Sequence, residues 1–209
     1  MRRLIVPRLR EMYPSARIIH ELPLRYSTNR IDLAAVTERE IVSVEIKSSK
    51  DVADRLEAQL RAFKPISSRV IVALAPKWNT KLEFLKEELQ GGHTRYAPQY
   101  TPVQEIIYRV GAEHMDVWTV DAAAGTIEPT INSYRSNRPW LSRMLHVLHV
   151  AELVEIAGRH QCWSGKRPVH HDLVDACTEH MTGREIVAAV CAALRARDAF
   201  GADSDAPVR

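Results

Sequence analysis

Two short apolar segments joined by a polar link constrain the fold of this chain more than any other part of its sequence. Residues 30–36 and 41–47 are rich in Ile, Val and Ala, and the link between them, residues 37–40, is polar. Two such segments separated by four link residues are typical of antiparallel strands in a β-hairpin. We therefore predict a hairpin that spans residues 30–47.

The register of this hairpin would bring two acidic side chains together. If Val36 faces Ile41 across the link, the same antiparallel pairing places Asp32 opposite Glu45. Directly opposed side chains lie roughly 4.5–5.5 Å apart at Cβ, and like charges there are destabilising. A divalent cation such as Mg²⁺ would remove the repulsion, because hard cations take carboxylate oxygens as ligands.

Lys47 is expected on the same strand face as Glu45, because side chains alternate between the two faces along a strand. A lysine there could orient or deprotonate an attacking water, or neutralise charge on a phosphorus-centred transition state. The alternative interpretation is a solvated hairpin face on which Lys47 pairs with Glu45 or another acid, and for an arbitrary surface hairpin this is the more frequent arrangement.

A helix is expected over residues 51–63, with Gln59 in the middle of its apolar stripe between Leu56 and Phe63. A buried amide is costly unless its donors and acceptors find partners. Gln59 is therefore either a core residue satisfied by backbone groups, or a site residue that contacts a metal-bound carboxylate, a water or a substrate phosphate.

Together these residues resemble the PD-(D/E)XK phosphodiesterase superfamily, which has the restriction-endonuclease-like fold. The resemblance rests on Asp32, on Glu45-Ile46-Lys47 in the next strand, and on Gln59 in the following helix. It implies an α/β core in which a central mixed β-sheet is flanked by helices. It also implies that Asp32, Glu45 and the backbone carbonyl of Ile46 bind Mg²⁺ or Mn²⁺, that Lys47 is the catalytic lysine, and that Gln59 supports the site.

The resemblance covers about residues 1–120 and leaves one ligand open. Many members add an upstream acid, for which Glu21 is the best match and Glu11 on the first predicted helix is the reserve. The alternative for Glu21 is an exposed strand residue. Ile31 stands where other members have proline, a common departure that leaves the metal-binding chemistry intact.

The resemblance implies a nucleic-acid substrate, with DNA and endonucleolytic cleavage expected, and the charge distribution is compatible with such a partner. Residues 1–78 hold 15 Lys and Arg against 9 Asp and Glu, whereas the whole chain has a net charge of only +3. A basic region suits a polyanionic partner, because phosphate contacts release condensed counterions. Arg30, Lys50 and Arg55 are the candidate nucleic-acid-binding residues.

Three regions are expected: a nuclease-like core over residues 1–137, a helical C-terminal region over 138–200, and a flexible tail over 201–209. The helical region could mediate homodimerisation or bind a protein partner. Residues 103–114 fit a helix or a strand. The remaining elements are expected as helices at 5–12, 80–89, 141–160, 168–180 and 182–197, and as strands at 18–22, 69–75 and 115–120.

Other features point to a cytoplasmic protein without a membrane span or a structural metal. No apolar run is long enough to cross a bilayer, the first residues are too soon interrupted for a signal peptide, and the three cysteines are widely spaced. His146, His149, Cys177 and His180 have zinc-like spacing, but no second ligand pair completes a site.

Two further interpretations of the sequence are open, one for individual residues and one for the whole chain. Trp118, Trp140, Trp163 and Tyr134 with Arg135 and Arg138 could stack on bases or contact phosphates, although aromatic residues more often fill cores. For the whole chain, the alternative to an active nuclease is a catalytically silent or partner-activated nucleic-acid-binding protein that retains the nuclease fold.

Overall fold

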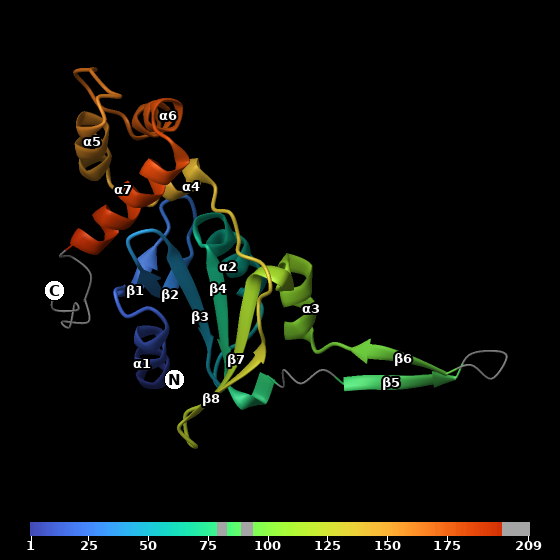
Figure 1. The fold of residues 1–209 in the computed structure, drawn as a ribbon. Helices are drawn as coiled ribbons and strands as arrows, with labels where there is room; N and C mark the ends of the chain where they lie inside the picture. The colour runs from blue at the N-terminus through green and yellow to red at the C-terminus, as the bar shows by residue number, and fades with distance from the viewer. Residues whose placement is uncertain (79–82, 89–93, 198–209) are drawn as a thin grey trace.

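The structure is a computed structural model that describes residues 1–78, 83–88 and 94–197 of the 209-residue chain. It is an α/β protein in which a six-stranded sheet has the order β1-β2-β3-β4-β7-β8 and a separate two-stranded sheet holds β5 and β6 (Figure 1). The strands are β1 (Arg17–Pro23), β2 (Arg30–Val36), β3 (Ile41–Lys47), β4 (Arg69–Leu74), β5 (Glu83–Glu88), β6 (Thr94–Gln99), β7 (Met115–Asp121) and β8 (Thr126–Ile131).

Helices cover this sheet and form the C-terminal region. Short 3₁₀ turns lie at Lys64–Ile66, Pro76–Trp78 and Ala112–His114. The α-helices are α1 (Arg2–Met12), α2 (Leu56–Phe63), α3 (Pro102–Val110), α4 (Leu141–Leu145), α5 (Val150–Arg159), α6 (His170–His180) and α7 (Gly183–Ala196).

The six-stranded sheet is mixed, as the sequence predicted. β1, β2 and β3 form an antiparallel meander, β4 and β7 continue the sheet parallel to β3, and β8 returns antiparallel to β7. Parallel neighbours need a crossover connection, and α2 supplies it between β3 and β4. The segment that holds β5, β6 and α3 supplies the next crossover, between β4 and β7.

Two apolar layers bury the two faces of the sheet. Val42 and Val44 of β3 point into a cluster that also holds Ile5 and Leu9 of α1. Side chains of the opposite parity, such as Ile41, point into a cluster formed with α2, α3 and residues of α4 to α7. Ser43, Glu45 and Lys47 follow Ile41 on that second face, so these polar side chains are directed toward the layer that α2 covers.

The helix that follows β3 is shorter than predicted. It was expected from residue 51, but α2 begins at Leu56, and Val52 is 64% exposed instead of lying in the apolar stripe. The backbone N–H of Ser48 donates to the Asp51 carboxylate at 2.6 Å. This local bond closes a turn in place of the first helical turn, which is the competition that Asp side chains commonly offer.

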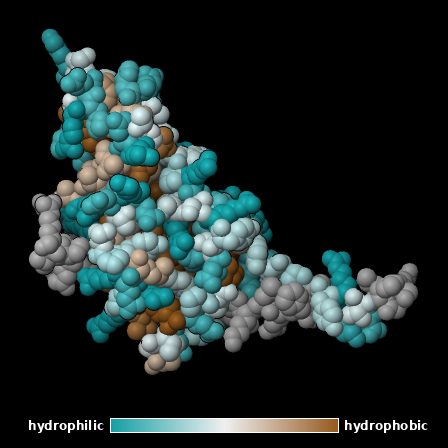
Figure 2. Space-filling model, in the orientation of Figure 1, coloured by the Kyte–Doolittle hydropathy of each residue, from teal (hydrophilic) through white to brown (hydrophobic). Residues whose placement is uncertain are grey.

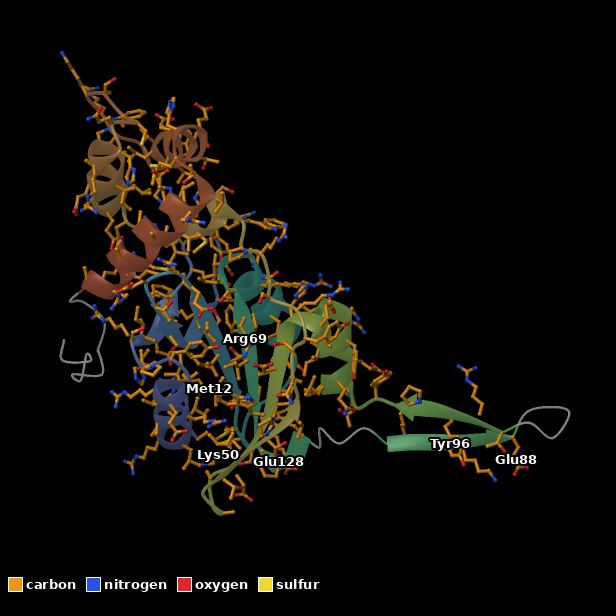
Figure 3. All side chains as sticks on the ribbon, viewed as in Figure 1. Met12, Lys50, Arg69, Glu88, Tyr96 and Glu128 are labelled. Carbon is orange, nitrogen blue, oxygen red and sulfur yellow. The ribbon has the colours of Figure 1, made fainter. Side chains whose placement is uncertain are left out.

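The predicted helix at residues 80–89 is wrong where the structure describes it. Residues 83–88 form β5, which pairs antiparallel with β6 from Glu83–Gln99 to Glu88–Thr94. Helix propensity is a weak preference, and here a partner strand satisfies the backbone instead. The arm formed by β5 and β6 projects from the body of the molecule, with Glu88 and Tyr96 on it (Figures 1 and 3).

The remaining predictions of helices and strands are largely confirmed. Residues 103–114, which the sequence left ambiguous, form α3 and a 3₁₀ turn, and Thr101 caps α3 with a capping box. The expected helix at 141–160 is divided into α4 and α5, and strand β8 was not predicted. The predicted boundary at residue 137 lies in the link between β8 and α4, and the predicted tail lies outside the described residues.

The outer surface is largely polar on the side seen in Figure 2. Among the described residues, no helix combines the length and the apolar character that crossing a bilayer would require.

Candidate active site

The predicted hairpin register is confirmed. Val36 pairs with Ile41, and the antiparallel ladder continues to the Leu33–Val44 pair, where it ends. Asp32 and Glu45 lie one step beyond that pair. The two predicted metal ligands therefore occupy the point at which β2 and β3 cease to pair through their main chains.

The Asp32 carboxylate lies in the gap that opens between the two strands. Its Oδ2 accepts a hydrogen bond from the Ile46 backbone N–H at 2.8 Å. In a strand, the N–H and C=O of one residue point to the same side, so the Ile46 carbonyl is also directed toward β2. On the other side of β3, the Lys47 carbonyl accepts from the Ala75 N–H at 2.8 Å.

Glu45 and Lys47 are buried beneath α2. Glu45 is 1% exposed and Lys47 is 7% exposed, and Lys47 Nζ lies 2.8 Å from Glu45 Oε1. The same ammonium donates to Gln59 Oε1 at 2.8 Å. Gln59 therefore reaches the predicted site, through the lysine. The alternative of a solvated hairpin face is wrong because α2 covers that face, although the ion pair that it included is present.

The electrostatics of Glu45 are unusual for a carboxylate. Burial and, second to it, the negative charge of Asp32 raise its pKa, Lys47 and Gln59 lower it, and the net pKa is about 7. Glu45 Oε2 is buried and accepts no hydrogen bond from any residue that the structure describes. A buried acceptor without a donor costs on the order of 1–3 kcal/mol, so this oxygen is suited to a cationic ligand.

The pKa of Asp32 is raised as well. Burial raises its pKa, while the Ile46 N–H and the positive charge of Arg2 lower it, and the net pKa is above the usual range of an aspartate. Two neighbouring carboxyl groups with raised pKa values are typical of a functional site.

On the other side of Asp32 lies Glu21. The pairs His20–Leu33 and Leu22–Ile31 bracket these two acids and place them at the same level of the β1–β2 ladder. Glu21 has a φ of 54°, a left-handed conformation that costs about 1–2 kcal/mol for a residue with a Cβ.

Arg2 of α1 joins these two acids, and the sequence analysis did not identify it. Its guanidinium forms an ion pair with Glu21 and donates to Asp32 Oδ1 at 3.3 Å. One signal was present in the sequence: the first turn of α1 contains arginines and no acid, an unfavourable arrangement at the positive end of a helix dipole.

The predicted nucleic-acid-binding residues surround the site without entering it. Arg30 has a side chain that is 65% exposed and lies 3.7 Å from the Glu21 carboxylate. Arg55 contacts Asn29 Oδ1 at 3.5 Å. Lys50 is exposed beyond the end of β3, and Figure 3 places it at the lower edge of the sheet.

The other sequence candidates lie elsewhere. Glu11 pairs with Arg8 on the exposed side of α1 at 3.0 Å. Trp118 is buried in the layer under α1, whereas Trp140 is 62% exposed. The ring of His146 stacks on that of His170 with centroids 5.2 Å apart.

A divalent cation fits the donor set only with main-chain and water ligands. Within the described residues, no three His, Cys, Asp or Glu side chains are grouped so that they could hold a metal ion together. Asp32 and Glu45 supply carboxylate oxygens, and the Ile46 carbonyl, which is directed toward β2, supplies a third hard oxygen donor. This is compatible with Mg²⁺, which commonly takes one or two carboxylates and keeps several waters.

Comparison with known proteins gives one partial similarity. No curated protein and no solved structure matches the chain significantly. The part that includes α1, the β1–β2–β3 meander and α2 does have a counterpart: residues 3–88 match the family described as bacteriophage P4 protein cII.

Proposed function

We propose that this chain is a divalent-metal-dependent phosphodiesterase that cleaves nucleic acid, with DNA as the preferred substrate and endonucleolytic cleavage as the reaction. The observation that carries the proposal is the buried Glu45 carboxylate, which has an unsatisfied oxygen beside a second acid and the Lys47 ammonium. Lys47 contacts only one oxygen of this carboxylate, and a cation bound at the other oxygen would offset the remaining cost of its burial. The proposal includes a restriction-endonuclease-like core, which the mixed sheet and its acid-bearing hairpin support.

Each residue has a role that follows from its position. Asp32, Glu45 and the Ile46 carbonyl would hold Mg²⁺ or Mn²⁺ at the end of the β2–β3 ladder. When bound, such an ion polarises a phosphoryl oxygen and acidifies an attacking water. Lys47 donates to the substrate phosphate or the attacking water and offsets the negative charge that develops on phosphorus.

Cleavage should depend strictly on a divalent metal. We expect the purified chain to cut plasmid DNA with Mg²⁺ or Mn²⁺ and to lose this activity in EDTA. Asp32→Asn should remain inactive at every metal concentration, because it removes a charged ligand. Gel electrophoresis of supercoiled, linear and single-stranded DNA would measure both effects. Robust cleavage that survived EDTA would contradict the proposed mechanism.

Gln59 should make a smaller contribution to the cleavage rate, because it acts by positioning Lys47. Gln59→Ala removes the oxygen that holds the Lys47 ammonium at 2.8 Å, so we expect cleavage to slow by about tenfold, the cost of losing roughly one hydrogen bond to a charged group. Arg61→Ala on the exposed side of the same helix is the control. Equal rates for the two variants would remove Gln59 from the site.

One observation favours the alternative of a silent binding protein. Arg2 and Lys47 already neutralise part of the acidic charge without a metal. A catalytically silent or partner-activated nucleic-acid-binding protein would bind DNA without cutting it, and Asp32→Ala would then tighten binding by removing a negative charge. Gel-shift titration of the wild type and this variant distinguishes the two functions.

A further inference from the structure

Arg2 contacts the proposed site from the opposite side of the sheet to Lys47. α1 packs on the face lined by Ile5 and Leu9, whereas Lys47 lies under α2. The Asp32 carboxylate is therefore held through both oxygens: the Ile46 N–H binds Oδ2, and the Arg2 guanidinium binds Oδ1. In this state a fixed cation occupies one side of a proposed metal ligand.

The contact is maintained against the local preference of the helix. Arg2 and Arg3 stand in the first turn of α1, where no acid is present and Met1 caps the helix without a side-chain hydrogen bond. Positive side chains at this end are disfavoured by the helix dipole. The ion pairs with Glu21 and Asp32 are therefore the interactions that favour this position for Arg2.

The same site cannot fully accommodate both cations. The Arg2 guanidinium and a divalent ion carry the same sign, and both require the Asp32 carboxylate. Glu21 offers the guanidinium a second anchor, which Arg30 shares at 3.7 Å. A metal ion that binds Asp32 would thus release Arg2 from that acid while Glu21 retains it, in the manner of a ligand that selects one of two conformations.

We propose that Arg2 is an internal counter-ion that competes with the divalent metal for Asp32 and so lowers the metal affinity of the site. This inference rests on the proposed function, since it assumes the metal site of Asp32 and Glu45. Arg2 is a positioning residue in this account: it acts on the metal ligand and does not contact the reacting phosphate.

Titration with Mn²⁺ alone tests the competition, by calorimetry or by the loss of the free-ion electron paramagnetic resonance signal. We expect Arg2→Gln to bind Mn²⁺ about tenfold more tightly than the wild type, which is within the usual range of coupling between two ligands. Arg3→Gln, on the same turn but exposed, should match the wild type. Arg2→Lys keeps the charge without the planar fork and should fall between the two, and this variant serves if Arg2→Gln does not fold.

The outcomes separate this inference from the proposed function. Tighter binding in Arg2→Gln that disappears in the Arg2→Gln/Asp32→Asn double variant would support the competition. Detectable binding of equal strength in the wild type, Arg2→Gln and Arg2→Lys would overturn the role of Arg2 and leave the metal site standing. If neither the wild type nor Arg2→Gln bound Mn²⁺, both the role of Arg2 and the proposed function would be wrong.

Discussion

Lys47→Ala should reduce the rate of DNA cleavage by roughly 10²–10⁴-fold, the usual contribution of a positioned group that transfers protons or offsets developing charge. The lysine is the one cation within 2.8 Å of Glu45 among the described residues, and α2 holds its ammonium through Gln59. Its removal leaves two acids without their shared neighbour, so Mn²⁺ affinity should not fall. We therefore expect this variant to lose cleavage rate without losing metal affinity.

Single-turnover cleavage and Mn²⁺ titration of the same preparation measure this separation. Lys166→Ala, in the exposed part of the helical region, is a charge-matched control that should cleave like the wild type. The loss of Lys47 also leaves Glu45 buried without its ion pair, and in the absence of Mn²⁺ we expect that carboxyl group to take up a proton, which the metal displaces, instead of unfolding the chain. Wild-type cleavage by Lys47→Ala would exclude the lysine from the chemistry.

The contribution of Glu45 to the stability of the metal-free protein should fall as the pH rises from about 4.5 to 7. The pKa of Glu45 is about 7 in the fold and near 4.5 in an unfolded chain. Between these values the folded state holds a proton that the unfolded state has released, so the free energy of unfolding falls with rising pH. At about 1.4 kcal/mol per pKa unit, the total loss is about 3 kcal/mol.

Urea denaturation at several pH values, in the presence of EDTA, would measure this dependence. His146 and His149 have pKa values lowered by burial, and they contribute the opposite slope because the fold favours their neutral form. The wild type should therefore be compared with Glu45→Gln, in which only the Glu45 contribution is absent. Saturating Mn²⁺ should abolish the difference, because it favours the ionised carboxylate. Identical pH profiles for the two proteins in EDTA would contradict the raised pKa.

The hairpin was predictable because its determinants are local. Alternation along β2 and β3, together with the length of the link, defined which residues pair, and the Val36–Ile41 register followed. The start of α2 was not predictable from the apolar spacing, since a side-chain bond from Asp51 to the Ser48 backbone replaces the expected helical turn. Local hydrogen bonds of this kind compete with periodicity.

The parts of the site that depend on long-range packing were harder to predict from the sequence. A strand with Ser43, Glu45 and Lys47 on one face appears amphipathic, yet α2 covers that face and buries both charged residues. Arg2 is thirty positions from Asp32, and only the packing of α1 on the sheet brings them together. Likewise, the sequence of residues 83–88 favours a helix, and only its pairing with β6 makes this segment the strand β5.

The apolar layer beneath α2 has a consequence for how the molecule unfolds. Val36 and Ile41 of the sheet belong to the same cluster of buried side chains as Leu148 and Leu194 of the helical region. Separating the two regions would expose this shared interior to water, at about 25 cal/mol for each Å² of apolar surface. The six-stranded sheet and the C-terminal helices are therefore thermodynamically coupled, and damage to the packing of one weakens the other.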